Sequence, residues 1–349
     1  MDKQDNINTI SQEITVDRGQ SPIRIDVFLL NKLEFVTRNR IQSAIKEGKV
    51  LVNDKIVKPN YKVRPLDSIL LEMPGNRDES KGVEPEDIPL KIIYEDDDLL
   101  VLDKEPGMVV HPGISNYSGT LVNALSHYLK DEDLPILAGN KADRAGLVHR
   151  IDKNTTGLLV IAKNDDTLSH LAKQFFDHSV KREYVALVWG NFDEKSGTYT
   201  GNIDRHPKHR KQRAVFPEGD KGKHAITHYE VLEDFYYVSL VKCRLETGRT
   251  HQIRVHMSHF GHPVFNDPDY GGDQIIKGTV FTKYKQYVQN CFNMMPRHAL
   301  HAKSLGFIHP KTGEQMHFEI PVPEDFAAVV EKWRNYLSGR KKSLEHDFQ

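Results

Sequence analysis

The sequence predicts an α+β protein in which a large mixed, mostly antiparallel β-sheet with flanking helices follows a smaller N-terminal domain. Three observations lead to this prediction. The 349 residues exceed the roughly 100–200 residues of a usual single domain. Residues 74–89, rich in proline, glycine and acids, are typical of a linker. Beyond them, short alternating or apolar segments outnumber helical ones, which favours an antiparallel sheet.

The overall composition excludes several classes of protein. Hydrophobic residues make up 38% of the chain, enough for a packed core. No run approaches the roughly 18 consecutive apolar residues of a membrane helix, and the polar start has no hydrophobic signal region. The two cysteines, Cys243 and Cys291, support neither a disulfide framework nor a cysteine-rich zinc site. We therefore expect a cytoplasmic protein with no membrane partner.

The N-terminal part divides into a polar tail and a small basic domain. Residues 1–22 have little periodicity and are typical of a flexible tail. Residues 23–73 carry ten lysines and arginines against six acids. Their apolar spacing predicts two helices, a hairpin and a further strand: 25–33, 38–46, 50–57 and 68–72.

The larger part covers residues 90–337, and residues 338–349 are expected to form a tail. Eight segments are strand candidates: 91–94, 99–102, 157–162, 183–189, 226–232, 237–245, 303–307 and 316–320. Four segments have helical spacing: 120–129, 166–176, 251–260 and 324–337.

The strongest local signal for chemistry surrounds Asp152. It lies between two cations, Arg150 and Lys153, ahead of two threonines and a glycine that lead into an apolar strand. Adjacent cations keep a carboxylate ionised, as a nucleophile or base requires, and small residues at a strand entry allow a ligand or a second backbone to approach closely. A surface turn with a solvated ion pair explains the pattern equally well, so both interpretations stay open.

Two further candidates are single residues near the starts of elements. Arg254 lies beside the apolar face of a helix that Thr250 is suited to cap, and it could reach a buried carboxylate bidentately. An exposed basic helix start is the other interpretation. Tyr184 opens a strand, where tyrosine is more often a core residue than a catalytic one.

The histidines and glycines argue against a metal or a nucleotide cofactor. His256 and His259 have a spacing that allows adventitious metal binding, but the His-Glu-x-x-His zinc pattern is absent. Neither a phosphate-binding Gly-x-x-x-x-Gly-Lys-Ser/Thr loop nor a dinucleotide-binding glycine pattern occurs. We therefore expect no metal and no cofactor.

A basic run, 205–213, suggests contact with phosphate despite a net charge of only −1 for the chain. Five of its nine residues are lysine or arginine and none is acidic. Such runs are usually solvated loops. With the basic domain at 23–73, this one offers phosphate contacts at a second place on the chain.

These segments together resemble the RluA-type pseudouridine synthases. His149–Gly157 is similar to the family's His-Arg-Leu-Asp-x-x-Thr-Ser-Gly signature, Gly248–His256 to its second motif and Arg297–Ala302 to a third. Residues 109–125 resemble the branch that modifies large-subunit ribosomal RNA, the synthase D type. Residues 23–73 resemble the small α-L RNA-binding domain.

The departures from the family pattern are modest. Ile151 replaces the usual leucine and Thr156 the usual serine, and both are close in shape. Residues 104–107 differ from the common Lys-Pro-x-Gly, which concerns a loop. These differences leave the expected activity unchanged and weaken only the inference that this chain modifies the same uridine as the family members it resembles.

The resemblance implies a catalytic domain over residues 90–337 that isomerises uridine to pseudouridine in RNA, on a flipped-out base and without a cofactor. By resemblance, Asp152 is the catalytic carboxylate, which either attacks C1′ or removes a ribose proton. We expect Arg254 to pair with it and Tyr184 to stack on the base. The expected substrate-binding residues are Arg150, Thr156, Arg249, His251 and Leu300. The expected RNA-binding residues are Arg38, Arg40, Lys46, Arg205, Lys208, Arg210, Lys211 and Arg213.

The expected partner is large-subunit ribosomal RNA or a precursor of that subunit, and a monomer is the simpler expectation. Three alternatives remain open. The chain could modify transfer RNA, or it could be a non-catalytic RNA-binding protein of ribosome assembly. A metal-dependent hydrolase built on the histidines is the third.

Overall fold

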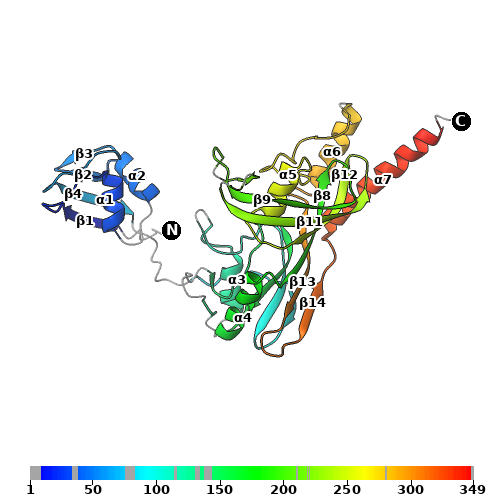
Figure 1. Ribbon diagram of the computed structural model, residues 1–349, viewed down its shortest axis with the longest axis horizontal. Coiled ribbons are helices and arrows are strands. Elements are labelled where there is room, and N and C mark those ends of the chain that lie inside the picture. The colour runs from blue at the N-terminus through cyan, green and yellow to red at the C-terminus, as the bar shows by residue number, and fades with distance from the viewer. Residues whose placement is uncertain are drawn as a thin grey trace, which may run out of the picture. The chain divides into compact units, whose positions relative to one another are not determined.

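The computed structural model describes residues 9–33, 38–74, 83–113, 116–129, 134–136, 144–209, 211–217, 219, 221–279 and 281–346. The chain divides into two compact units, residues 1–82 and 83–349 (Figure 1). The described residues of the two units build separate hydrophobic cores. None of the helices within these ranges has the length and hydropathy needed to cross a membrane.

The described residues of the first unit form a small antiparallel sheet with two helices. The strands follow the order β1-β4-β2-β3. Its elements are β1 (Thr9–Thr15), α1 (Ile25–Lys32), α2 (Arg38–Lys46), β2 (Val50–Val52), β3 (Lys55–Ile56) and β4 (Ser68–Pro74). Both predicted helices, the hairpin and the strand near residue 70 are confirmed. Asn53 and Asp54, at the hairpin tip, both have positive φ, 49° and 60°, as a two-residue turn between twisted strands requires.

The prediction of a tail over residues 1–22 is wrong for β1. Its seven residues pair with β4 from Thr9 opposite Pro74 to Thr15 opposite Ser68. Threonine, serine, glutamine and glutamate make this segment resemble a disordered one. An edge strand needs only backbone hydrogen bonds and one covered face, however, so a polar composition does not prevent it. Residues 1–8 lie outside the described residues.

The described residues of the second unit build a ten-stranded sheet. Its strands run in the order β10-β9-β11-β12-β8-β13-β7-β6-β5, and β14 pairs with β13. Among the described pairings of these named strands, only that of β13 with β7 is parallel, so the predicted mixed, mostly antiparallel sheet is confirmed. The strands are β5 (Ile92–Glu95), β6 (Leu99–Lys104), β7 (Thr156–Ala162), β8 (Lys181–Trp189), β9 (Ser196–Arg205), β10 (Arg213–Phe216), β11 (Lys223–Asp234), β12 (Val238–Leu245), β13 (Leu300–Ile308) and β14 (Gln315–Glu319).

Five helices of the described part flank this sheet. They are α3 (Leu121–Tyr128), α4 (Asp165–Phe176), α5 (Gln252–His259), α6 (Thr282–Met294) and α7 (Glu324–His346). In Figure 1, α5 lies against β9 and β11, and α7 continues outward from the body of this unit. All eight predicted strands and four predicted helices occur, whereas β9, β10 and α6 were not predicted. The tail expected over 338–349 is helical as far as His346.

The centre of the sheet brings three distant segments together. Ala302 of β13 lies opposite Tyr184 of β8 and beside Gly157 of β7. Gly157 has a φ of +114°, and a Cβ there would lie 2.2 Å from the carbonyl oxygen of Ala302. Only glycine permits this approach of two backbones. The small residue predicted at the strand entry therefore sets the distance between β7 and β13.

Candidate active site

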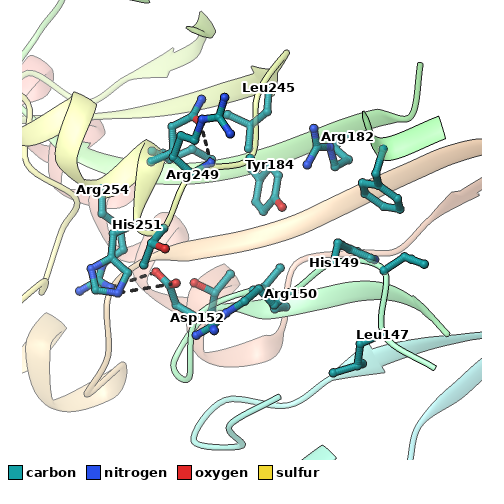
Figure 2. A pocket seen from close by; sticks show the side chains of 18 of the residues that line it. Leu147, His149, Arg150, Asp152, Arg182, Tyr184, Leu245, Arg249, His251 and Arg254 are labelled. Atoms are coloured by element: carbon teal, nitrogen blue, oxygen red, sulfur yellow. Dashed lines mark hydrogen bonds and ion pairs between the residues drawn. The ribbon is translucent and has the colours of Figure 1, made fainter. Parts of the chain in front are cut away.

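An open pocket of about 570 Å³ lies on the second unit, within the range of about 300–1,000 Å³ that ligand pockets occupy. Its walls come from the segment before β7, the start of β8, the segment 245–254 and the start of β13 (Figure 2). These segments are far apart in the sequence. The fold thus gathers the three strongest sequence candidates, Asp152, Tyr184 and Arg254, into one cavity.

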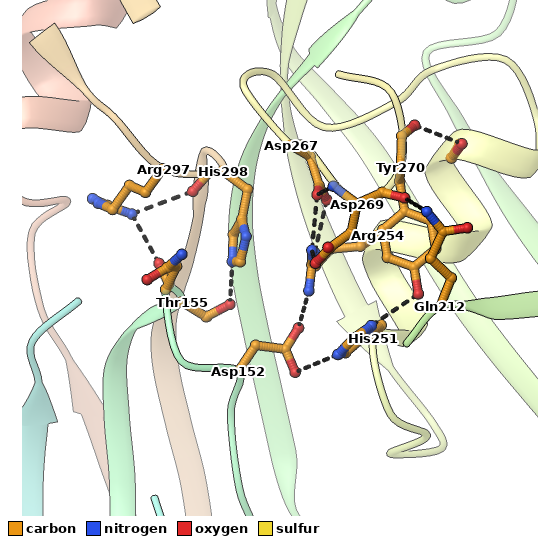
Figure 3. Close-up of polar contacts among 12 residues, drawn as sticks. Asp152, Thr155, Gln212, His251, Arg254, Asp267, Asp269, Tyr270, Arg297 and His298 are labelled. Atoms are coloured by element: carbon orange, nitrogen blue, oxygen red, sulfur yellow. Dashed lines mark hydrogen bonds and ion pairs between the residues drawn. The ribbon is translucent and has the colours of Figure 1, made fainter. Parts of the chain in front are cut away.

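Asp152 belongs to a polar cluster at this pocket, in which it contacts Arg254 and His251 (Figure 3). Its Oδ2 accepts a hydrogen bond of 3.0 Å from Nη1 of Arg254. Its Oδ1 lies 3.8 Å from Nε2 of His251. The carboxylate is 17% exposed, so it is largely withdrawn from water and still open to a ligand.

Arg254 is fixed by carboxylates on its other side. Its Nε and Nη2 donate to Asp267 at 2.7 and 2.8 Å, and Nη2 also donates to Asp269 at 2.6 Å. The guanidinium lies 5.0 Å from the centre of the Tyr270 ring. Burial favours the neutral form, but the pairing with Asp267 and its neighbours raises the pKa of Arg254. The side chain is therefore a permanent cation with one nitrogen directed at Asp152.

The net direction of the pKa of Asp152 is downward. Burial alone would raise it, but His251 and Arg254 favour the carboxylate. Burial lowers the pKa of His251 itself, so Arg254 is the partner that stays charged across the neutral range. The arrangement keeps Asp152 ionised at neutral pH, as either a nucleophile or a base must be.

His251 precedes α5 in a left-handed conformation, with a φ of 57°. Its Nδ1 lies 2.8 Å from the Tyr270 hydroxyl, which also accepts from the backbone N–H of Arg213 at 2.9 Å. Burial raises the pKa of Tyr270 to about 12, so this hydroxyl keeps its proton. In the tautomer in which Nδ1 accepts that proton, the N–H of the neutral His251 ring is at Nε2, facing Asp152.

The walls of the pocket hold most of the other predicted residues (Figure 2). Tyr184 is 7% exposed, its ring projects from β8 into the pocket, and burial raises the pKa of its hydroxyl. Leu300 is a buried apolar part of the wall. Arg150 is exposed, and its Nη1 lies 3.1 Å from Nε2 of His111. The Nε of Arg249 donates to the backbone carbonyl of His224.

Thr156 is the one predicted substrate-binding residue that does not line the pocket. It is buried, and its hydroxyl lies 2.9 Å from Nδ1 of His301. Thr155 lines the pocket instead, bonded to Nε2 of His298 at 2.8 Å. Successive side chains of an extended chain point to opposite faces, which accounts for the exchange of roles.

The predicted RNA-binding residues lie in two places. Lys46 is exposed at the end of α2, and of Arg38 and Arg40 the structure describes the backbone within that helix. The basic run 205–213 is the tip of the β9–β10 hairpin, in which Arg205 pairs with Arg213. Lys208 and Lys211 are exposed there, whereas Arg210 lies outside the described residues.

Several residues of the site escaped the sequence analysis. Asp267, Asp269 and Tyr270 follow the second motif by more than ten residues, and no periodicity connects them with it. Lys104 is a further case. It is 1% exposed, and its Nζ donates to three carbonyls, including that of Lys153 at 3.0 Å. Burial lowers the pKa of Lys104 to about 7, and the bond to Lys153 anchors the backbone next to Asp152.

A metal site at the pocket finds no support among the described residues. There, one group offers three ligand atoms: Asp96, Asp98 and His309. Asp96 is already bonded to His309 and to the Tyr94 hydroxyl, at 2.9 and 2.8 Å. None of the three lines the pocket.

Each of the two units matches a known protein family model. Residues 98–259 match a family model described as RNA pseudouridylate synthase, and residues 23–69 match the S4 domain model. A protein of Chlorobaculum parvum named "Uncharacterized RNA pseudouridine synthase" is 48% identical over 328 residues, which cover 93% of this chain and 98% of that protein. The ribosomal large subunit pseudouridine synthase D of Nitrosomonas europaea is 42% identical over 332 residues, covering 95% of this chain and 90% of that one.

A solved structure shares its fold with a large part of this chain. It is titled "Human RNA Pseudouridylate Synthase Domain Containing 4", and it matches with a TM-score of 0.51 and 22% sequence identity. The match covers 70% of this chain and 93% of the human one.

Proposed function

The chain belongs to the RNA pseudouridylate synthase family, and from this premise we propose that it isomerises specific uridines of large-subunit ribosomal RNA to pseudouridine. The choice of ribosomal RNA is supported by relatives named ribosomal large subunit pseudouridine synthase D, which match this chain over nearly its whole length. We expect it to act as a monomer in the cytoplasm.

The reaction breaks the N1–C1′ bond of uridine, turns the uracil and joins C5 to C1′. C5 loses a proton and N1 gains one, so the reaction consumes neither an oxidant nor a second substrate. These atoms are inaccessible inside a stacked helix, and the target nucleotide must therefore leave the stack and enter the pocket. The open pocket beside Asp152 has the volume that such a ligand needs.

The observation that carries the proposal is the ion pair between Asp152 and Arg254 at this pocket. Whether the carboxylate attacks C1′ or removes a ribose proton, it must be ionised, and the fixed guanidinium keeps it so. Tyr184 stacks on the uracil and assists removal of the C5 proton. Leu300 bounds the base on its apolar side, while Arg150, Arg249 and His251 contact the ribose and phosphates.

Binding of the surrounding RNA falls to two basic elements. One is the S4 domain, within the proposed RNA-binding domain of residues 23–73. The other is the tip of the β9–β10 hairpin in the proposed catalytic domain of residues 90–337. Tyr270, which binds both the Arg213 backbone and His251, connects this tip to the neighbourhood of Asp152. A phosphate bound at the tip would therefore be connected to the catalytic carboxylate by a short chain of polar contacts through Tyr270 and His251.

Tritium release tests the proposal. RNA transcripts carrying tritium at uracil C5 are incubated with the protein, and released tritium is counted for large-subunit ribosomal and for transfer RNA. We expect release from ribosomal RNA by the wild type and none by Asp152→Asn, whose neutral amide neither attacks nor accepts a proton. Asp193→Asn, at an exposed aspartate outside the pocket, is the matched control and should retain activity.

The other outcomes discriminate between the alternatives. Release from transfer RNA alone would keep the isomerase and overturn the substrate. Activity retained by Asp152→Asn would overturn the catalytic assignment. No release from free transcripts or from precursor ribosomal particles, with RNA binding intact, would indicate a non-catalytic RNA-binding protein.

A further inference from the structure

Arg182 of β8 is a buried cation without a carboxylate partner in the described part of the chain. Its side chain is 7% exposed, and its Nε has no hydrogen-bond partner. No described carboxylate forms an ion pair with it, although its guanidinium lies 5.3 Å from the centre of the Phe175 ring. Arg254, by contrast, is bonded to three carboxylates. Because burial of an unpaired charge is costly, the position of Arg182 calls for a ligand.

The side chain of Arg182 opens into the pocket that contains Asp152. It is two residues before Tyr184 on the same strand, so both side chains point to the same face, and both line the pocket (Figure 2). Gly248 lies on the other side of the guanidinium, since a Cβ there would come within 2.9 Å of Nη1. The guanidinium thus occupies a space bounded by an aromatic ring and a bare stretch of backbone.

The neighbouring polar groups do not neutralise this charge. His149 stacks on Phe175 with ring centres 4.5 Å apart, and its Nε2 accepts from the backbone N–H of Val160. Burial and the nearby Arg182 lower the pKa of His149 to about 3, so the ring is neutral under ordinary conditions. The described residues on this side of the pocket therefore leave the charge of Arg182 uncompensated.

We infer that Arg182 binds a backbone phosphate next to the flipped uridine, an inference that rests on the proposed function. The phosphates are the anions that RNA carries, and a planar guanidinium offers two parallel donors that match two phosphate oxygens. With Tyr184 on the uracil and Asp152 at the ribose, a phosphate at Arg182 would hold the nucleotide at a third point. Three points of contact fix the orientation of C1′ toward the carboxylate.

Uridine 3′,5′-bisphosphate and uridine are suitable probes, because they differ only in the phosphates on the two sides of the nucleoside. Dissociation constants for both are measured with the full-length wild type, Arg182→Met, Arg182→Lys and Lys181→Gln. Lys181 is exposed and precedes Arg182 on the strand, so its side chain points to the opposite face and its replacement removes the same charge as a control. Thermal unfolding is recorded for every variant.

We expect the preference of the wild type for the bisphosphate over uridine to fall by about tenfold or more in Arg182→Met, as removal of a charge-assisted hydrogen bond predicts. Arg182→Lys should keep part of the preference and Lys181→Gln all of it. The unfolding temperature of Arg182→Met should stay unchanged or rise, since an apolar side chain replaces an unpaired buried charge. A purely structural arginine would lower stability when removed.

An unchanged preference in a folded Arg182→Met would overturn the inference. If tritium release then falls nonetheless, Arg182 supports the reaction without binding a phosphate. The test also separates this inference from the proposed function. Should the wild type release no tritium while its preference for the bisphosphate still depends on Arg182, the isomerase proposal fails and the phosphate site stands.

Discussion

Asp267 holds Arg254 by two parallel hydrogen bonds, 2.7 and 2.8 Å long, with both side chains almost completely buried. This pair uses Nε and Nη2 of the guanidinium and leaves Nη1 for Asp152. Asp267 does not itself line the pocket. Asp267 lies outside the cavity, yet it sets the orientation of the Arg254 guanidinium. That guanidinium in turn keeps the candidate catalytic carboxylate of Asp152 ionised.

Asp267→Asn should slow turnover without weakening RNA binding. The amide keeps the shape of the side chain but removes its charge and one acceptor, so Arg254 loses its fixed orientation. We expect single-turnover tritium release to fall about 10–100-fold, as with the removal of a partner that orients a functional group. The unfolding free energy should fall by up to roughly 3–5 kcal/mol, because a buried ion pair is broken.

Asp269→Asn is the matched control for this change. Its carboxylate is 46% exposed and gives Arg254 a single ion-pair contact, so both effects should be much smaller. Equal loss of turnover in the two variants, or full turnover in Asp267→Asn, would contradict a positioning role for Asp267.

Tyr184→Phe should separate stacking from proton transfer. The ring is retained, so affinity for RNA should change little, whereas release of the C5 proton should slow by about 100-fold, a usual effect of losing a general acid–base group. Because burial raises the pKa of Tyr184, only a small fraction of the hydroxyl is ionised in the neutral range, so a rate limited by proton transfer to the phenolate should increase with pH there. Full activity of the phenylalanine variant would leave Tyr184 a stacking role only.

Acid should destabilise the second unit through its buried histidines. Burial lowers the pKa values of His256 and His301 to about 4, so between about pH 6.5 and 4 the unfolded chain binds more protons than the folded one. Stability must then decrease as the pH falls through this window, by on the order of 3 kcal/mol per histidine at its acid end. Urea unfolding at pH 7, 5.5 and 4.5 measures it.

His301→Gln isolates one of these contributions. Glutamine keeps a hydrogen-bonding group near Thr156 but does not titrate. The slope of the unfolding free energy against pH should therefore decrease by the amount that corresponds to about one bound proton. A variant with the slope of the wild type would show that His301 titrates at its ordinary pKa.

Strands and helices with a regular pattern of buried apolar residues could be predicted from the sequence. The elements that escaped prediction have residues that are mostly exposed or only partly buried. The strand β7 is buried at every position and was predicted. The strand β9 was not predicted, because its residues are mostly polar and all but two of its ten positions are exposed or half-buried. The helix α6 did carry a signal, since Tyr284, Val288 and Cys291 are buried at helical spacing in a segment with many polar residues.

The same limit applies to the candidate site. Asp152, Arg254 and Tyr184 stand in recognisable motifs, so their convergence could be anticipated. The pairing of Arg254 with Asp267 depends on how the chain after α5 turns back, which no local pattern encodes. Arg182 was within reach, because its position two residues before Tyr184 on a strand places it on the same face.

Removal of residues 1–82 should weaken RNA binding and reduce its dependence on salt. The second unit has its own hydrophobic core, so it should keep its fold, and circular dichroism with thermal unfolding checks this first. For every phosphate that the shortened protein no longer neutralises, the slope of log affinity against log salt concentration should become shallower by about 0.7–0.9.

Catalysis on a saturating concentration of RNA should survive this deletion, because every residue assigned to the pocket lies beyond residue 110. The double variant Lys208→Gln/Lys211→Gln, in the full-length chain, tests the β9–β10 tip in the same way and should flatten the slope independently. If the truncated protein binds with the affinity and slope of the full-length chain, the S4 domain does not contribute phosphate contacts to this RNA. The affinity would then depend on the second unit alone, and the tip variant should account for most of the salt dependence.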